Sequence, residues 1–254
     1  MISNSATNPR LTDQGFRNVF RRVARDTVQA KMAAEYLAEH WADRKIAILH
    51  DGEAYGMGLA EETRAQLNAR GTKEVIFDQI APAQADYAET LARLEAAGVD
   101  VLFYAGYAPE AGLLVRQSID RGFELQVIGP DSLQTEYFWH VAGPAAEGVV
   151  FPSYGDPRGN QEATEVVKTF RAEGFEPEGI TLYSYAAVQA WTQAVEQAGT
   201  FETEAVAKVL REGEFDTVLG LIGFDEKGDI TGVETFAWYV WKGGNYVPLE
   251  LPGD

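Results

Sequence analysis

The sequence predicts an α/β protein built on a doubly wound parallel sheet, and three observations support this fold class. Short apolar runs alternate along the chain with amphipathic segments at helical spacing. These runs are continuously apolar, as in strands that are buried on both faces. Gly71, Gly98 and Gly122 each follow a helical segment, where a helix usually ends. In this fold class, ligands bind beyond the carboxyl ends of the strands.

The first part of the chain contains most of the alternation. It opens on a short apolar run, Met1–Ile2, that breaks at once into the small polar residues 3–8 and then Pro9. Small polar residues at a strand end present N–H groups and hydroxyls to a ligand. The elements expected next are helix 27–41, strand 44–50, helix 59–69, strand 75–77, helix 87–97, strand 101–104, helix 110–121, strand 126–128 and a short helix near 134–141.

The composition changes at 149–157, where an apolar run enters turns rich in Pro and Gly. We interpret this segment as a passage between two lobes. The elements expected beyond it are helices 161–172, 183–198 and 204–211 with hardly a strand among them, strands 219–224 and 236–241, and a terminal hairpin closed by 243–245. We expect Asp225–Asp229 to be a turn, because it lacks the spaced ligands and closing Glu of an EF-hand loop.

Composition excludes several functional classes. A chain of 254 residues, 46% of them hydrophobic, exceeds the usual size of one domain and suggests two. It contains no Cys, no apolar run of about 18 residues and no signal-peptide pattern at its start. A net charge of −18 argues against a nucleic-acid partner. The one basic cluster is expected to be a solvated face or a contact between domains: Arg17, Arg21, Arg22 and Arg25.

Catalytic motifs are absent from the sequence. There is no His-Glu-x-x-His, no Gly-x-Ser-x-Gly and no Cys, so we expect no enzyme, no metal and no cofactor. The loop 51–58 fails as a dinucleotide-binding motif, because Glu61 stands where the helix needs Gly or Ala. His50 is the one candidate base, although a histidine at a strand end more often has a structural role.

Candidate ligand-binding residues follow the predicted strands. Tyr55 and Tyr107 lie in strand-end loops, where each either lines a pocket or packs at a domain edge. Asp131, in a Gly-Pro turn, either accepts a ligand ammonium or serves as the N-cap or the approach turn of the helix that follows near Gln134. Thr7 either binds ligand or closes on its own backbone as a turn hydroxyl.

Five separated segments together resemble the leucine/isoleucine/valine-binding proteins, the type I periplasmic substrate-binding subunits of ABC importers. The similarity runs in order along the whole chain. These segments are Ser5–Pro9, Ile48–Asp51 with Tyr55–Gly56, Tyr104–Glu110, Tyr185–Gln189 and Phe224–Asp229.

The resemblance implies a site for a branched-chain or related amino acid in a cleft between two lobes. Ser5, Ala6 and Thr7 would bind its α-amino and α-carboxylate groups, Asp131 would pair with the ammonium, and Tyr55 and Tyr107 would line the cleft. The family often has Glu where this chain has Asp131. The resemblance also implies a periplasmic location, hinge closure around the ligand and docking of the closed protein on a permease.

The resemblance assigns the chain to two lobes. The assignments are a partial N-lobe of 1–24 with 155–225, a C-lobe of 26–151 with 229–254, and crossings near 24–26, 151–154 and 224–229. In that family about 90 to 100 residues, comparable to a small domain, precede the Ser-Ala-Thr-Asn-Pro strand. We therefore expect an incomplete N-lobe and weak or no ligand binding by this chain alone.

An incomplete N-lobe would leave helices 161–172 and 183–198 without a sheet to cover. We therefore expect homo-oligomers, strand exchange or a loose N-lobe. The apolar side chains concerned are Val166, Val167, Phe170, Val188, Trp191 and Val195. Two alternative functions stay open: a sensor of the same fold that binds an amide, urea or another small solute, and an α/β enzyme with His50 or Asp131 as base.

Overall fold

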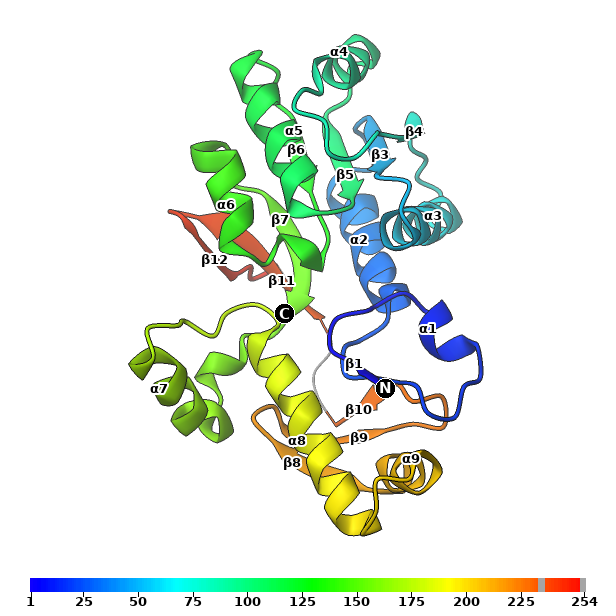
Figure 1. Ribbon diagram of the computed structural model, residues 1–254. Helices are drawn as coiled ribbons and strands as arrows, with labels where there is room; N and C mark the ends of the chain where they lie inside the picture. The colour runs from blue at the N-terminus through cyan, green and yellow to red at the C-terminus, as the bar shows by residue number, and fades with distance from the viewer. Residues whose placement is uncertain (233–235, 252–254) are drawn as a thin grey trace. The chain divides into compact units, whose positions relative to one another are not determined.

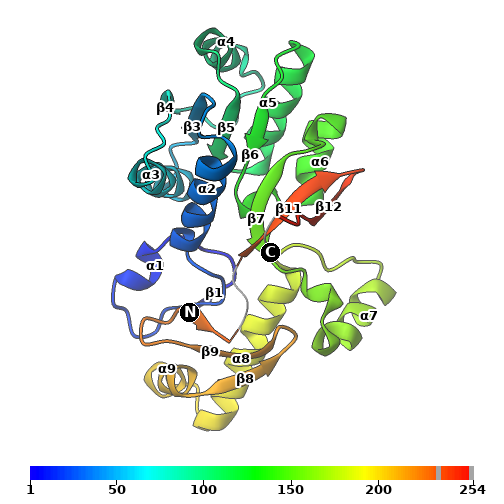
Figure 2. The same cartoon turned by 180° about the vertical axis from the view of Figure 1, so that it is seen from behind.

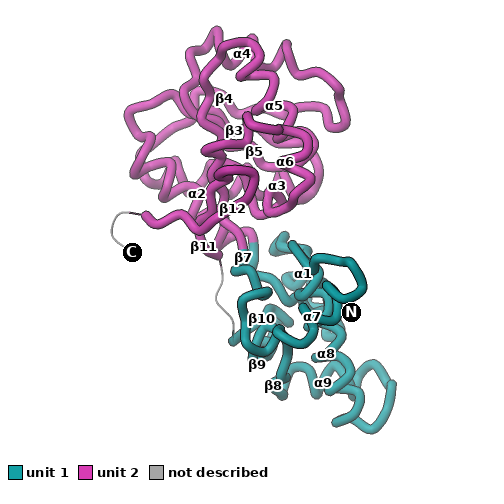
Figure 3. The backbone as a smooth tube through the Cα atoms, turned by 90° about the vertical axis from the view of Figure 1, so that its left-hand side faces the viewer, with its two compact units in different colours: residues 1–25, 154–235 teal, residues 26–153, 236–254 magenta. Residues whose placement is uncertain are grey.

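The computed structural model describes residues 1–232 and 236–251, and the chain divides into two compact units (Figure 3). Unit 1 comprises residues 1–25 and 154–235, and unit 2 comprises residues 26–153 and 236–254. Each unit is therefore built from two separate stretches of the chain.

Unit 2 follows the predicted alternation of strands and helices (Figure 1). Its elements are α2 (Asp26–His40), β3 (Ile46–His50), α3 (Ala54–Ala69), β4 (Ile76–Gln79), α4 (Ala88–Ala97), β5 (Val101–Ala105), α5 (Ala108–Asp120), β6 (Gln126–Ile128), the 3₁₀ helix η1 (Asp131–Leu133), α6 (Glu136–Ala142), the 3₁₀ helix η2 (Gly143–Ala146), β7 (Val150–Tyr154), β11 (Phe236–Lys242) and β12 (Asn245–Pro248).

One seven-stranded sheet runs through unit 2 in the order β12-β11-β7-β6-β5-β3-β4. The strands from β3 to β7 pair in parallel, and Ile48 lies opposite Phe103 on one side and Phe77 on the other. β11 and β12 form the expected antiparallel hairpin at one edge. Because the strand order steps outward from β3 in both directions, the sheet is doubly wound, as predicted.

Helices cover both faces of this sheet. Alternate strand residues point to opposite faces, so Ile48 and Phe103 belong to one core and Leu49 and Leu102 to the other. The first core packs against α2 and α3, and the second packs against α4, α5 and α6. Figures 1 and 2, seen from opposite sides, show these two helical layers in turn. Burial on both faces explains the continuously apolar strands of the sequence.

Unit 1 has smaller sheets. Its elements are β1 (Ile2–Ser3), α1 (Arg10–Asp13), β2 (Phe20–Arg21), the 3₁₀ helices η3 (Pro157–Gly159) and η4 (Gln161–Ala163), α7 (Thr164–Ala172), α8 (Thr181–Ala198), α9 (Thr203–Glu212), β8 (Glu214–Thr217), β9 (Gly220–Phe224) and β10 (Ile230–Thr231). β1 and β2 pair in parallel, whereas β8, β9 and β10 form an antiparallel sheet.

The antiparallel sheet corrects the expectation that the helices of this region have hardly a strand among them. α8 and α9 pack against it through a core that includes Ala190, Leu210 and Phe215. The sequence did not reveal β8, because its Glu and Asp side chains alternate with only two buried residues. β10 pairs with β9, so residues 230–231 lie in unit 1.

Several apolar side chains of α8 are nevertheless exposed. Val188 is 61% exposed and Trp191 is 45% exposed, whereas Val167 of α7 is buried and Val166, Phe170 and Val195 are partly buried. The expected bare apolar surface is therefore restricted mainly to one face of α8. No helix among the described residues is long and apolar enough to cross a membrane.

Candidate functional site

In unit 2, Asp131 lies at the carboxyl end of β6, where a network of hydrogen bonds holds its carboxylate. Its Oδ1 accepts hydrogen bonds from the Tyr55 hydroxyl at 2.6 Å and from Gln29 Nε2 at 3.0 Å. The backbone N–H of Asp131 donates to Gln29 Oε1 at 2.6 Å. The side chain is 7% exposed. These three bonds fix the position of a negative charge at the edge of the sheet where a ligand is expected.

The alternative role of Asp131 as a helix cap is wrong for α6. The N-cap of α6 is Thr135, whose hydroxyl accepts the N–H of Tyr137 at 3.2 Å. Asp131 instead begins the 3₁₀ helix η1, whose N-cap is Pro130. Asp131 therefore lies in the turn that approaches α6 and does not cap that helix.

Tyr107 adds a second aromatic ring to this group. It precedes α5 in extended conformation, and its ring centre lies 5.3 Å from that of Tyr55. Burial raises the pKa of the Tyr107 phenol, and the carboxylates of Asp51 and Asp131 raise it further. Tyr107 is therefore uncharged at neutral pH and serves as a half-exposed aromatic surface with a polar tip.

Gln29 is the residue that the sequence analysis missed. It lies fully buried in the first turns of α2, and its amide also donates to Asp26 Oδ1 at 3.2 Å. A glutamine in a helix gives no local signal for a partner 102 positions away. The contact depends on the parallel sheet, which brings the start of α2 and the end of β6 to one edge.

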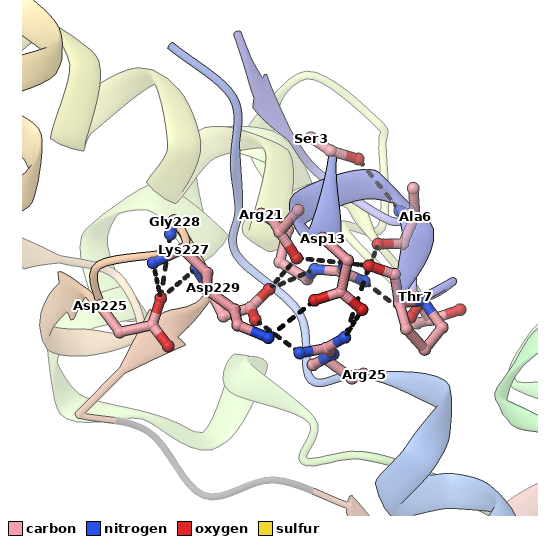
Figure 4. Close-up of polar contacts among 12 residues, drawn as sticks. Ser3, Ala6, Thr7, Asp13, Arg21, Arg25, Asp225, Lys227, Gly228 and Asp229 are labelled. Carbon is pink, nitrogen blue, oxygen red and sulfur yellow. Dashed lines mark hydrogen bonds and ion pairs between the residues drawn. The ribbon is translucent and has the colours of Figure 1, made fainter. Parts of the chain in front are cut away.

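In unit 1, Ser5, Ala6 and Thr7 form the loop that follows β1 (Figure 4). The N–H of Ala6 donates to Ser3 Oγ at 3.1 Å, and the hydroxyl of Ser5 donates to Asn4 Oδ1 at 3.2 Å. Ser5 and Ala6 are exposed, whereas Thr7 is buried. The loop therefore presents small polar groups on a backbone whose own hydrogen bonds hold it in shape.

Arg21 holds this loop in place through hydrogen bonds to its backbone carbonyls. Its Nη1 donates to the carbonyls of Ala6 at 3.1 Å and Thr7 at 2.6 Å. Its Nε lies 2.6 Å from Asp229 Oδ1, which also accepts the hydroxyl of Thr12 at 2.7 Å. Figure 4 shows the cluster that results. A fully buried guanidinium that is paired and hydrogen-bonded on several sides fixes the loop to the turn 225–229.

This cluster corrects the interpretation of the basic residues as a solvated face. Arg21 and Arg22 are buried, while Arg25 bridges Asp13 and Asp229. The segment 225–229 is the predicted turn: Asp225 Oδ1 accepts the N–H groups of residues 227, 228 and 229, and Gly228 has a positive φ of 93°.

The six predicted ligand-binding residues thus fall into two groups. In unit 2, Tyr55 contacts both Asp131 and Tyr107, and in unit 1 residues 5–7 form one loop. His50 is buried, and its Nδ1 accepts the N–H of Gly52 at 3.0 Å. Within the described part of the chain, no three His, Asp or Glu side chains are arranged to hold a metal.

The family model and the relatives that match this chain are all solute-binding proteins. Residues 1–245 match the family model described as "Periplasmic binding protein". The chain is 44% identical to a Leu/Ile/Val-binding protein homolog 1 from Brucella suis over 96% of this chain and 67% of that protein. It is 37% identical to Leu/Ile/Val-binding protein BraC3 from Rhizobium johnstonii over 98% and 68% of the two chains.

Solved structures give the same result. A leucine-binding protein LivK from Thermotoga maritima matches with a TM-score of 0.86 at 23% identity, over 98% of this chain and 72% of that one. An ABC transporter substrate-binding protein from Desulfitobacterium hafniense, solved in complex with Leu, matches with a TM-score of 0.76 at 28% identity, over 98% and 72% of the two chains.

Proposed function

The chain belongs to the periplasmic binding protein family, and on that premise we propose that it binds a branched-chain or related amino acid for an ABC importer. The names of its relatives support the amino-acid class. The periplasmic location, the N-lobe and C-lobe assignments, hinge closure around the ligand and docking on a permease form part of the same proposal.

The proposal depends on the carboxylate of Asp131, which is held by Gln29 and by Tyr55, whose ring in turn contacts the ring of Tyr107. A buried carboxylate fixed by neutral donors is suited to accept the ammonium of an amino acid, since charge-assisted hydrogen bonds are the stronger ones. The aromatic rings supply apolar surface for the rest of the solute. Neighbouring groups of this kind favour binding over catalysis.

The loop 5–7 of unit 1 supplies the complementary groups. Its hydroxyls and backbone N–H groups are donors of the kind that bind a carboxylate. Arg21 holds the carbonyls of Ala6 and Thr7 in place, so the loop keeps its shape before ligand arrives. Preorganisation of this kind reduces the entropic cost of binding.

The test is the change Asp131→Asn, which keeps the shape of the side chain and removes its charge. We expect it to weaken amino-acid binding about 10- to 100-fold, because a hydrogen bond to a charged group contributes about 1.5–3 kcal/mol. Gln29→Leu should weaken binding by a smaller factor, since Asp131 keeps its bond to Tyr55. Glu136→Gln, at an exposed carboxylate in the following helix, is the matched control.

Binding of L-leucine, L-isoleucine and L-valine would be measured by calorimetry and by ligand-detected NMR at millimolar ligand. Both the 254-residue chain and a chimera that adds the upstream segment of the Brucella suis relative would be tested. Undiminished binding by Asp131→Asn would refute the role of its carboxylate. Absence of binding by the chimera would refute the proposed function.

A further inference from the structure

Arg22 lies at the same edge of unit 1 as the loop 5–7. β1 and β2 run in parallel with Ser3 opposite Arg21, so the residues that follow the two strands meet at their common carboxyl end. The N–H of Arg22 donates to the Ser3 carbonyl at 3.1 Å, and its Nη2 donates to the Asn4 carbonyl. Arg22 therefore sits directly beside the residues proposed to bind the solute.

The guanidinium of Arg22 is 1% exposed and has an aromatic environment. It lies 3.8 Å above the ring of Tyr183, whose centre is 5.2 Å from that of Tyr154. Burial lowers the pKa of Arg22 to about 9, so the group still carries its charge at neutral pH. A cation–π contact offsets part of the cost of burying this charge.

The donors of Arg22 are not all used. Its Nε and Nη1 atoms have no hydrogen-bond partner, and no Asp or Glu forms an ion pair with it, within residues 1–232 and 236–251. The neighbouring Arg21 shows the contrast: it is equally buried but is matched by Asp229, Thr12 and backbone carbonyls. A buried cation is stable when an anion and hydrogen-bond acceptors surround it, and Arg22 lacks the anion.

Two residues that contact Arg22, Asn4 and Tyr183, carry polar groups. The Asn4 side chain donates to Ser184 Oγ at 2.7 Å, and the Tyr183 hydroxyl donates to the Gly155 carbonyl at 2.6 Å. Loop 5–7 and Asp131 already account for the α-carboxylate and the α-ammonium of an amino acid. An aliphatic amino acid therefore has no further anionic group that could pair with Arg22.

We propose that Arg22 binds a carboxylate in the side chain of the solute, which extends the solute class of this protein to acidic amino acids. This inference rests on the proposed function. Arginine suits the role because its planar guanidinium presents several fixed donors to a carboxylate, and the bond is charge-assisted. The carboxylate would supply the missing negative charge and leave Arg22 paired as Arg21 is.

L-Glutamate and L-glutamine form the decisive pair of probes, since they have nearly the same shape and differ in charge. We expect the unmodified chain to bind glutamate at least about tenfold more tightly than glutamine. Arg22→Met should remove this difference, and it should weaken L-leucine binding by less than it weakens glutamate binding, because leucine has no side-chain carboxylate. Arg22→Lys should restore part of the preference, because it keeps the charge and loses the planar fork. Arg17→Met, at an exposed arginine of the same segment, is the matched control.

The dissociation constants would be measured by calorimetry and ligand-detected NMR on the 254-residue chain and on the chimera described above. Circular dichroism would check that each variant folds. Equal binding of glutamate and glutamine by the unmodified protein would overturn the inference, and this result does not require Arg22→Met to fold. If leucine still binds in that case, the proposed function is retained. Failure of the chain and the chimera to bind any of the three amino acids would overturn both.

Discussion

The two units are stabilised in different ways. Unit 2 is organised around one seven-stranded sheet whose central strands are apolar and fully buried between two layers of helices. Unit 1 has two small sheets, and its loops are joined by the buried pair of Arg21 and Asp229. Apolar burial between helices and one large sheet dominates in unit 2, whereas unit 1 combines smaller apolar cores with a buried ion pair that joins remote segments.

The two units also differ in how their helices expose apolar side chains. In unit 2 the apolar faces of the helices lie against the sheet, and β3, β5 and β7 are buried along their whole length. In unit 1, α8 keeps Tyr185, Val188 and Trp191 exposed. Unit 1 is therefore the part in which single substitutions should most readily change stability or association.

The largest effect is expected from Arg21→Met. The change leaves the Asp229 carboxylate buried without its closest cation and should cost unit 1 about 3–5 kcal/mol. Amide hydrogen exchange read by mass spectrometry would separate the units: exchange should accelerate in unit 1, including 5–12 and 214–224, and stay unchanged in the central strands of unit 2.

Arg25→Met is the control for Arg21→Met, because Arg25 is partly exposed and lies 3.4 Å from Asp229. Its loss should cost less than about 1 kcal/mol, as is usual for exposed pairs. Equal acceleration of exchange in both units after Arg21→Met would show that the two units do not differ in the way described.

An intermediate effect is expected on the exposed face of α8. We predict that copies of the chain associate through this face, and that Val188→Lys with Trp191→Lys weakens association by about 2 kcal/mol, or about 30-fold. Sedimentation velocity over a range of concentrations would measure it. Gln197→Lys, at an exposed position near the end of α8, is the control for the added positive charge. A monodisperse monomer before any substitution would contradict this prediction.

The smallest effect is expected at Glu176, an exposed carboxylate of unit 1. Hydrogen bonds from Arg171 and then Arg158 lower the pKa of Glu176 to about 2. Its stabilising contribution is therefore complete above its usual pKa of 4.5 and is lost as the pH falls through about 2. Solvent screening keeps the contribution below about 1 kcal/mol.

Urea unfolding of Glu176→Gln and of the unmodified chain between pH 2 and pH 7 would test this dependence. The difference in unfolding free energy should be constant above pH 4.5 and vanish near pH 2. If the difference in unfolding free energy between the two proteins instead grew toward low pH, it would contradict a stabilising role for the ionised Glu176. A small effect here would confirm that exposed pairs cannot replace the buried one in unit 1.

Prediction from sequence succeeded where one local pattern determines one element. Strand 126–128 was predicted with its observed bounds, because an apolar run flanked by polar and turn residues has few alternatives. Helix α3 begins at Ala54 instead of the predicted residue 59, since Gly56 and Gly58 concealed its first turn. The short strands β8 and β10 were missed, because their burial depends on partners that adjoin them only in the folded unit.

The candidate site shows the same limit. The position of Asp131 after a strand could be predicted, and so could the neighbouring loop of Tyr55, because parallel strands end at one edge. Their bond to Gln29 could not be predicted, since it joins positions 102 residues apart. The difference between Arg21 and Arg22 was equally hidden, because adjacent residues on a strand face opposite sides and only the fold decides which meets an acid.

The joining of Thr12 and Asp229, which are 217 positions apart, has a consequence for biosynthesis. A ribosome that adds about 5–20 residues per second needs on the order of 10 to 40 s to travel from the first of these residues to the second. During that interval the opening segment has emerged without its partners, while most of the strands of unit 2 are already available to pair. The nascent chain must therefore expose most strands of unit 2 before it can close the hydrogen bond between Thr12 and Asp229 in unit 1.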